Sequence, residues 1–465
     1  MTRSQNMPPQ DMPPQDMPPQ TDDRTLGAVT AHAPGGRRPW HHLRAMQAEM
    51  IPYLEHLAAQ GDFLRIPLGV TTAYFVNRPD LVQEVLVTQA RAFHKPSTVK
   101  AVAAKLFGEN LFTSDGEVWR VLRKGVQPAF HARRVNAYAE SMVQMTQDAI
   151  SPWQPGQTVE MTQAMMQLTL GITTQALFGM DLRNQEAGDA IVEFIELFNQ
   201  RISSPAPAWL PTKADRQMRG LIQAGVDLLQ PLIEERRASG QDTGDVLSML
   251  LAAQAGDTTG ILTDDQVRNE ISNLFAAGYE VVGNTLCFTL YLIAAHPQVE
   301  AALLAEIRAT LGDRPVTVAD LAQMPVLERV LNESMRLLPA TTVVARQVAE
   351  PVTVAGVAMR RKDVVMVAPW TLHRRPDLFP DPLVFDPERF GPERREMIPK
   401  HGFIPFSTGP RICLGSAFAT LQMKVNLATI LQQWRPSLLP DYTLSPVYRF
   451  NTRPDGGLPM RVDRA

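Results

Sequence analysis

The stretch FSTGPRICLG, residues 406–415, decides how the rest of this 465-residue sequence is interpreted. Gly409 permits a tight turn, and Gly415 lets the backbone come close to a flat partner. Cys413 lies just before the last predicted helix, whose N-terminal N–H groups favour a thiolate, and Arg411 supplies a cation for an acidic group nearby. A lone cysteine is more often a buried apolar side chain than a ligand, but a loop with flanking glycines and an arginine favours the ligand.

The composition is that of an ordinary globular protein, with 45% hydrophobic and 20% charged residues. The net charge of −3 lacks the basic excess of nucleic-acid-binding proteins, so we expect no nucleic-acid partner. The two cysteines, Cys287 and Cys413, can build neither a disulfide framework nor a zinc cluster, which favours a reducing, cytoplasmic setting. The histidines lack metal-binding spacing, so a cysteine is the better candidate for a metal ligand.

The N-terminal residues 1–37 differ in composition from the rest of the chain. They contain the sequence MPPQD, repeated almost three times, and no apolar core. This composition predicts a disordered, proline-rich tail rather than a signal peptide or a membrane anchor. No proline- or glycine-rich linker divides residues 38–465, so we expect these residues to form a single domain.

Helical periodicity dominates from about residue 80, with short strands on both sides of it. Predicted helices cover residues 101–107, 117–126, 134–150, 161–177, 188–200, 213–238, 263–295, 326–338 and 415–434. Predicted strands cover residues 62–68, 71–76, 345–348, 351–357 and 364–367. The pattern predicts a mainly α fold with a smaller β lobe.

The longest predicted helix, residues 263–295, begins with the capping-box pattern TDDQ and ends before a His-Pro pair. Glu280 is the only charged residue in its apolar second half, so length and composition also allow a membrane-spanning interpretation. Polar residues in that half, among them Asn273 and Asn284, argue against it, and we expect no transmembrane anchor. A carboxylate is costly to bury in so apolar a helix, which marks Glu280 as a candidate functional residue.

At every fixed position, residues 406–415 match F-x-x-G-x-R-x-C-x-G, the haem-binding loop of the cytochromes P-450. The chain resembles the soluble, bacterial-type members of this superfamily over roughly residues 40–460. The resemblance implies that the cofactor is haem b, iron protoporphyrin IX, and that Cys413 is the axial thiolate on the iron. It also implies that Phe406 and Gly415 contact the haem, which lies between the long helix and the helix after Cys413.

Three further residues match a structural network of the same family. Glu333 and Arg336 form its E-x-x-R pattern, which is weak evidence alone because such pairs cover many helix surfaces. Arg389 lies in a segment that resembles the family's P-E-R-F sequence. The resemblance implies that these three charges form a buried network that holds the loop of Cys413, so that loss of one partner leaves a buried charge uncompensated.

Four residues match positions that contact the haem propionates in this family. Trp119 and Arg123 reproduce its W-x-x-x-R pattern, and their spacing places both on one face of a helix. Arg346 occupies the position of another propionate-binding arginine, and Arg411 is the third. The resemblance implies that all four bind the cofactor. Without it, Trp119 could equally be a core residue and Arg123 a surface residue.

The sequence departs from the family at one position of the long helix. Ala277-Gly278-Tyr279-Glu280 matches the family's A-G-x-[D/E], but Val281 replaces the threonine that follows. In the family this hydroxyl binds water and helps to deliver protons during oxygen activation, and valine cannot form hydrogen bonds. Three explanations are open: a substrate hydroxyl or water replaces the alcohol, the enzyme uses peroxide directly, or the protein does not perform monooxygenation.

The resemblance implies a monooxygenase that inserts one atom of O2 into a lipophilic substrate such as a fatty acid, terpenoid or carotenoid-like molecule. By family position, the apolar pocket is expected to include Leu274, Phe275, Ala277, Val343 and Val344. Electrons are expected from a separate ferredoxin or flavodoxin with its reductase. A possible basic docking face comprises Arg120, Lys124, Arg133, Arg134, Lys400 and Lys424. The alternative is a peroxygenase or another haem-thiolate protein, because of Val281.

Overall fold

The computed structural model describes residues 31–32, 39–181, 193, 197, 201 and 210–465. The tail expected over residues 1–37 lies outside this part of the chain, except for Ala31–His32. These two residues form strand β1, which pairs in parallel with β2 (Phe63–Leu68). The helix expected over residues 188–200 also falls almost entirely outside the described residues.

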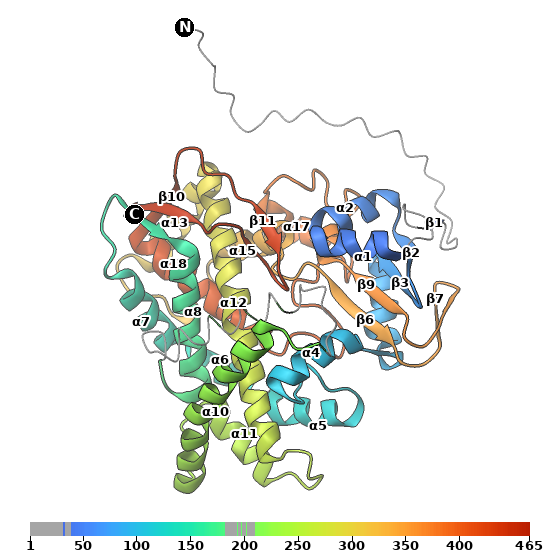
Figure 1. Cartoon of the computed structure of the whole chain (residues 1–465). Helices are drawn as coiled ribbons and strands as arrows, with labels where there is room; N and C mark the ends of the chain where they lie inside the picture. Colours follow the sequence, from blue (N-terminus) through green and yellow to red (C-terminus); the bar gives the residue numbers. More distant parts are fainter. Residues whose placement is uncertain (1–30, 33–38, 182–192, 194–196, 198–200, 202–209) are drawn as a thin grey trace.

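Helices dominate the described chain, with strands gathered mainly at one side, so the predicted mainly α fold with a smaller β lobe is confirmed (Figure 1). The helices are α1 (Pro39–Ala48), α2 (Met50–Gln60), α3 (Pro79–Gln83), α4 (Ser97–Phe107), α5 (Gly116–Val126), α6 (Ala132–Ala137), α7 (Ala139–Ile150), α8 (Met161–Phe178), α10 (Lys213–Ser239), α11 (Val246–Ala255), α12 (Asp264–Ala295), α13 (Pro297–Leu311), α14 (Val318–Leu321), α15 (Pro325–Leu337), α16 (Pro369–Leu372), α17 (Pro392–Arg395) and α18 (Ser416–Gln433).

The largest sheet has the strand order β1-β2-β3-β9-β6-β4. A three-stranded sheet has the order β10-β13-β5. Two further sheets have two strands each: β11 pairs with β12, and β7 pairs with β8. The remaining strand bounds are β3 (Thr71–Val76), β4 (Phe93–His94), β5 (Gln157–Glu160), β6 (Val344–Val348), β7 (Val352–Val354), β8 (Val357–Met359), β9 (Val364–Val367), β10 (Trp434–Leu438), β11 (Pro446–Tyr448), β12 (Thr452–Pro454) and β13 (Pro459–Arg464).

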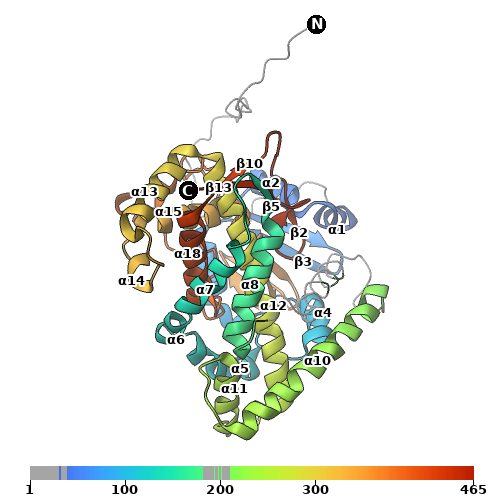
Figure 2. The ribbon, with the colours of Figure 1, turned by 90° about the vertical axis from the view of Figure 1, so that its left-hand side faces the viewer.

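Helix α12 runs through the middle of the helical part and lies beside α8 (Figure 2). Its first turn is capped by the Thr263 side chain, which accepts a hydrogen bond from the N–H of Gln266. Gly278 allows the close approach to α8, because a Cβ at this position would lie 2.7 Å from Cγ2 of Thr173. The helix ends before Pro297, as the sequence predicts.

Two predicted elements differ from the observed ones. The helix expected over residues 134–150 is divided at Tyr138, whose hydroxyl donates a hydrogen bond to the carbonyl of Gly244 and whose ring packs on Phe418. The strand expected over residues 351–357 is instead a hairpin of β7 and β8. Ala355 and Gly356 both have positive φ, at 47° and 78°, which turns the chain back on itself.

No single helix in the described part of the chain is long and apolar enough to cross a membrane. Helices α12 and α13 together meet the length and composition criteria, but the chain bends by 110° between them.

Candidate functional site

The loop before α18 is fixed by its own backbone. The N–H of Cys413 donates a hydrogen bond to the carbonyl of Phe406, and that of Ile412 donates to Gly409, both at 3.0 Å. Gly409 has φ +78°, and a Cβ there would lie 1.9 Å from the carbonyl oxygen of Leu86. Only glycine fits this turn, so the sequence pattern sets the geometry that presents the cysteine.

The Cys413 side chain lies in a desolvated region and still has accessible surface. Burial raises the pKa of its thiol, while the N–H of Gly415 and the charges of Arg123 and Lys95 act in the opposite direction. Without a bound metal, desolvation therefore outweighs the thiolate-favouring effect that we expected from the N-terminus of α18. An exposed cysteine whose thiol is desolvated by nearby protein suits an iron ligand, because metal coordination deprotonates a thiol outright.

Several cations gather beside this loop, around the carboxylate of Asp115. Arg411 donates to Asp115 at 2.5 Å, and Lys100 donates to its other oxygen at 2.7 Å. The guanidinium of Arg411 also lies 4.7 Å from the ring centroid of Trp119. Arg346, on β6, is 8% exposed and interacts electrostatically with both Arg411 and Asp115. The structure therefore brings together three of the four predicted propionate-binding residues.

The electrostatics of this cluster fit a bound anion. Burial lowers the pKa of Arg346 to about 10 and also lowers the pKa values of Arg411 and Lys95, whose positive charges disfavour one another. In Arg411, Nη1 is buried and has no hydrogen-bond partner. A buried, unpaired donor among several cations is costly unless a carboxylate completes the site. The residues here fit the propionates of haem.

Arg123, the fourth predicted propionate contact, has a different partner in the structure. Its Nη1 donates a hydrogen bond to the carbonyl of Ile412 at 3.1 Å. Its charge also interacts with Cys413. Arg123 therefore contacts the backbone of the cysteine loop rather than the cation cluster around Asp115.

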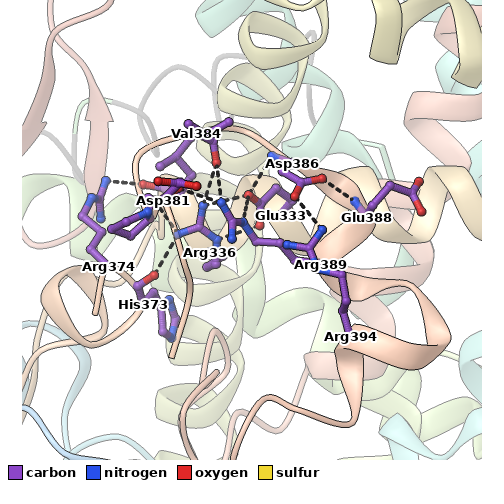
Figure 3. A network of polar contacts seen from close by, with 12 residues as sticks. Glu333, Arg336, His373, Arg374, Asp381, Val384, Asp386, Glu388, Arg389 and Arg394 are labelled. Carbon is purple, nitrogen blue, oxygen red and sulfur yellow. Dashed lines mark hydrogen bonds and ion pairs between the residues drawn. The ribbon is translucent and has the colours of Figure 1, made fainter. Parts of the chain in front are cut away.

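Glu333, Arg336 and Arg389 form one buried network (Figure 3). Arg336 donates to both carboxylate oxygens of Glu333, at 2.6 and 2.7 Å, and both side chains are 0% exposed. Arg389 donates to the same carboxylate at 3.3 Å. Arg336 also donates to the carbonyl of His373, whose ring accepts a hydrogen bond from the N–H of Ile404. This histidine links the network to the segment that leads into the cysteine loop.

On α12, a patch of accessible surface lies between buried turns. Ala277 is exposed and Val281 is half-buried, whereas Tyr279 and Glu280 are buried at 2% and 6% exposure. The hydroxyl of Thr285 donates to the carbonyl of Val281 at 2.8 Å, within the helix. Thr285 therefore does not supply a hydroxyl in place of the missing threonine.

The predicted pocket residues divide into two groups. Leu274 and Phe275 are half-buried and pack partly against the core formed by α5, α8 and α11. Val343, just before β6, and Val344, its first residue, are half-buried against the β lobe. Ala277, described above, is the most accessible of the five.

Sequence reasoning did not predict several contacts of the site, although by family position residues 100–112 and 447–451 were expected near the substrate pocket. Lys95, Lys100 and Asp115 complete the cation cluster, and their significance depends on loops that meet only in the folded chain. His373 is a lone histidine without a pattern around it. Asn451, at the tip of the β11–β12 hairpin, donates to Glu280 at 3.3 Å. No local signal in the sequence marks these contacts.

No group of three or more His, Cys, Asp or Glu side chains is arranged to hold a metal ion within the described ranges. A metal centre of the usual multi-ligand kind is therefore not present among these residues. A single protein ligand such as Cys413 suits a metal that a macrocycle already holds.

Comparisons with known proteins agree with this geometry. The family model described as Cytochrome P450 matches residues 38–456. Cyclooctatin synthase and cyclooctat-9-en-7-ol 5-monooxygenase, both from Streptomyces melanosporofaciens, are each 32% identical to this chain; the alignments cover 89% and 90% of it and 91% of each relative. The solved haem domain of cytochrome P450DA is 26% identical, with a TM-score of 0.83 over 93% of this chain and 96% of that one. Members of the matched family bind haem b through a cysteine ligand. The chain belongs to the cytochrome P450 family.

Proposed function

We propose that this protein is a monooxygenase that inserts one oxygen atom from O2 into a terpenoid-like substrate. The observation that carries the proposal is the exposed Cys413 beside a cation cluster in which Nη1 of Arg411 is buried without a partner, in a fold whose long helix exposes apolar Ala277. Bound haem supplies oxygen activation. The chain would supply the thiolate ligand, the propionate contacts and the apolar lining.

Within this proposal, Cys413 ligates the iron, and Arg411, Arg346 and Trp119 hold the propionate side of the cofactor. Lys95 and Lys100 add charge to the same cluster. Arg123 steadies the cysteine loop through the carbonyl of Ile412, and Phe406 and Gly415 contact the cofactor at the ends of this loop.

Glu280 is proposed to hold protons that are delivered during oxygen activation. Val281 beside it donates no hydrogen bond, so the alcohol of a substrate or an ordered water takes the place of the missing hydroxyl. A substrate that already carries a hydroxyl suits this arrangement, because its own alcohol can be placed near the valine.

The substrate class is supported by the relatives and by the lining. One relative is named for the 5-monooxygenation of cyclooctat-9-en-7-ol, a ring-containing unsaturated alcohol. The proposed pocket residues are apolar: Leu274, Phe275, Ala277, Val343 and Val344. A terpenoid-like alcohol is therefore favoured over a fatty acid or a carotenoid-like molecule.

Monooxygenases of this family need a redox partner. We place its docking face at α5, where a pocket of about 340 Å³ is lined by Arg120, Arg123, Lys124 and neighbouring residues. Arg120 and Lys124 are exposed there, and Arg133 on α6 and Lys400 are exposed elsewhere. Lys424 and Arg134 are already paired with Glu328 and Asp242. Such a face suits an acidic ferredoxin or flavodoxin in a reducing cytoplasm.

The second candidate function is a peroxygenase, which Val281 favours because direct use of peroxide needs no threonine-assisted proton delivery. One experiment separates the two. Lipophilic compounds are first screened for a substrate-induced change of the iron spin state, with ring-containing unsaturated alcohols compared with fatty acids. Those that bind are then incubated with ferredoxin, its reductase and NADPH, or with hydrogen peroxide alone.

We expect the terpenoid-like alcohols to bind most tightly and to give a product that carries one atom from isotopically labelled O2. Product formed only with peroxide would overturn the monooxygenase proposal in favour of the peroxygenase. Tight binding confined to fatty acids would overturn the proposed substrate class.

A further inference from the structure

The tip of the β11–β12 hairpin contacts α12 at Glu280, the one charged residue in the apolar second half of this helix. Asn451 donates from its side-chain amide to Oε2 of Glu280, with a donor–acceptor distance of 3.3 Å. Glu280 is only 6% exposed, and the two residues are 171 positions apart in the chain. A carboxylate in such surroundings depends on fixed donors, because water is not freely available to orient it.

The hairpin that carries Asn451 is itself anchored to the protein. The N–H of Thr452 donates to the carbonyl of Ala340 at 2.7 Å, and its hydroxyl bonds to that of Thr342 at 2.6 Å in a buried contact. The N–H of Arg449 donates to the carbonyl of Asn451 at 2.9 Å and closes the tip. These hydrogen bonds fix the backbone that carries Asn451, and therefore also restrict the position of the side-chain amide that contacts Glu280.

The same tip also contacts the loop between α4 and α5. The ring of Phe450 lies edge-on to that of Phe112, with centroids 6.1 Å apart. The neighbouring Leu111 donates its N–H to Glu270 on α12 at 2.7 Å. The hairpin tip, this loop and α12 are thus joined in a ring of contacts.

We propose that Asn451 is a positioning residue for the Glu280 carboxylate. The amide fixes the orientation of the acid in a chain whose next residue, Val281, contributes no hydroxyl. Through the contact between Phe450 and Phe112, the same tip also connects Glu280 to the loop between α4 and α5. This inference rests on the proposed monooxygenase function for its consequence, which is efficient use of reducing equivalents, but the contact itself is tested independently.

The test uses the haem-loaded protein and two readouts. The first is coupling, the fraction of NADPH oxidised that ends as product rather than as hydrogen peroxide. The second is the C–O stretching frequency of carbon monoxide bound to the reduced protein, which responds to polar groups on the distal side and needs no turnover. Asn451→Leu removes the donor and keeps a side chain of similar size, Asn451→Ala removes it by truncation, and Asn451→Gln keeps an amide. Arg449→Gln changes an exposed residue of the same tip and is the matched control.

We expect Asn451→Leu and Asn451→Ala to lower coupling about tenfold, the effect of losing one hydrogen bond to a charged group. Both should shift the C–O stretch, whereas Arg449→Gln should change neither readout and Asn451→Gln should restore part of the coupling. In a Glu280→Gln background, Asn451→Leu should cause no further change in either readout, because its effect passes through the acid.

Unchanged coupling and an unchanged C–O stretch in Asn451→Leu would overturn the proposal. An effect of equal size in the Glu280→Gln background would also overturn it. If Asn451→Leu fails to load haem, the Asn451→Ala protein decides by the same criteria. A failure of the proposed function can be told apart from a failure of this proposal. In that case no substrate is converted, but the C–O stretching frequencies of the Asn451 variants, with and without Glu280→Gln, still change as predicted.

Discussion

Nε2 of His373 accepts a hydrogen bond from the backbone N–H of Ile404 at 2.9 Å, inside a fully buried contact. The carbonyl of the same histidine accepts from Arg336 at 2.8 Å. One residue thus connects the Glu333–Arg336 pair to the segment before the cysteine loop. The role is possible only for a neutral imidazole, since a protonated ring has no acceptor.

The His373 contact predicts a loss of stability in acid. Burial, followed by the charges of Arg336 and Arg374, lowers the pKa of His373 from 6.5 to about 3. The native ring stays neutral while the unfolded chain takes up a proton below pH 6.5, so this stability is complete above that pH and is lost as pH falls toward 3. Relative to His373→Leu, which does not titrate, the wild type should lose about 2 kcal/mol between about pH 7 and about pH 5.

Urea unfolding of the two haem-loaded proteins at several pH values measures this difference. A free-energy gap between wild type and His373→Leu that stays constant over this range would contradict a neutral native histidine.

Removing Glu333 should destabilise the protein strongly. Glu333→Ala leaves Arg336 and Arg389 as buried cations without their carboxylate, which costs on the order of 3–5 kcal/mol. We expect little haem-loaded protein and a lowered thermal unfolding temperature. Asp265→Ala breaks the exposed pair between Asp265 and Arg268 on α12 and should cost less than about 1 kcal/mol. Normal haem content in Glu333→Ala would show that the network does not hold the cysteine loop.

Arg411 is predicted to slow the release of haem. Arg411→Gln removes a cation whose Nη1 is buried without a partner and whose charge faces Asp115, so a propionate contact is lost. Transfer of haem to an excess of a scavenging apoprotein should become about tenfold faster. Arg461→Gln, which alters an exposed arginine of β13, is the control and should leave the rate unchanged. Equal rates in all three proteins would remove Arg411 from the cofactor site.

Val281→Thr tests the departure from the family pattern. The two side chains have nearly the same shape, so the haem spectrum should stay the same while a hydroxyl appears beside Glu280. We expect about threefold less hydrogen peroxide for each NADPH oxidised, measured with substrate and a ferredoxin system. Peroxide release equal to that of the wild type would mean that the missing alcohol does not limit proton delivery.

The parts of the site that the sequence predicts are those carried by local spacing. Glu333 and Arg336 lie three residues apart on one helix and therefore must share a face, and Gly409 and Cys413 belong to one short loop. The cation cluster depends instead on tertiary structure, because Lys95, Asp115 and Arg346 come from a loop, a helix cap and a strand. No periodicity in the sequence relates these positions.

The same limit applies to the fold. Helix α12 was predictable from its cap and its apolar length, whereas the break at Tyr138 follows from contacts with Gly244 and Phe418, which are distant in sequence. The contact between Asn451 and Glu280 likewise requires the C-terminal hairpin to be anchored at Thr342. Such contacts become visible only when the chain is folded.

The most direct test of haem-thiolate ligation is the carbon monoxide difference spectrum of the reduced protein. The wild type should show the absorption band characteristic of a thiolate trans to carbon monoxide. Cys287→Ala, which changes the other, fully buried cysteine, should retain this band, and Cys413→Ser should lose it. A wild type without the band, or a Cys413→Ser protein that keeps it, would contradict the assignment of Cys413 as the iron ligand.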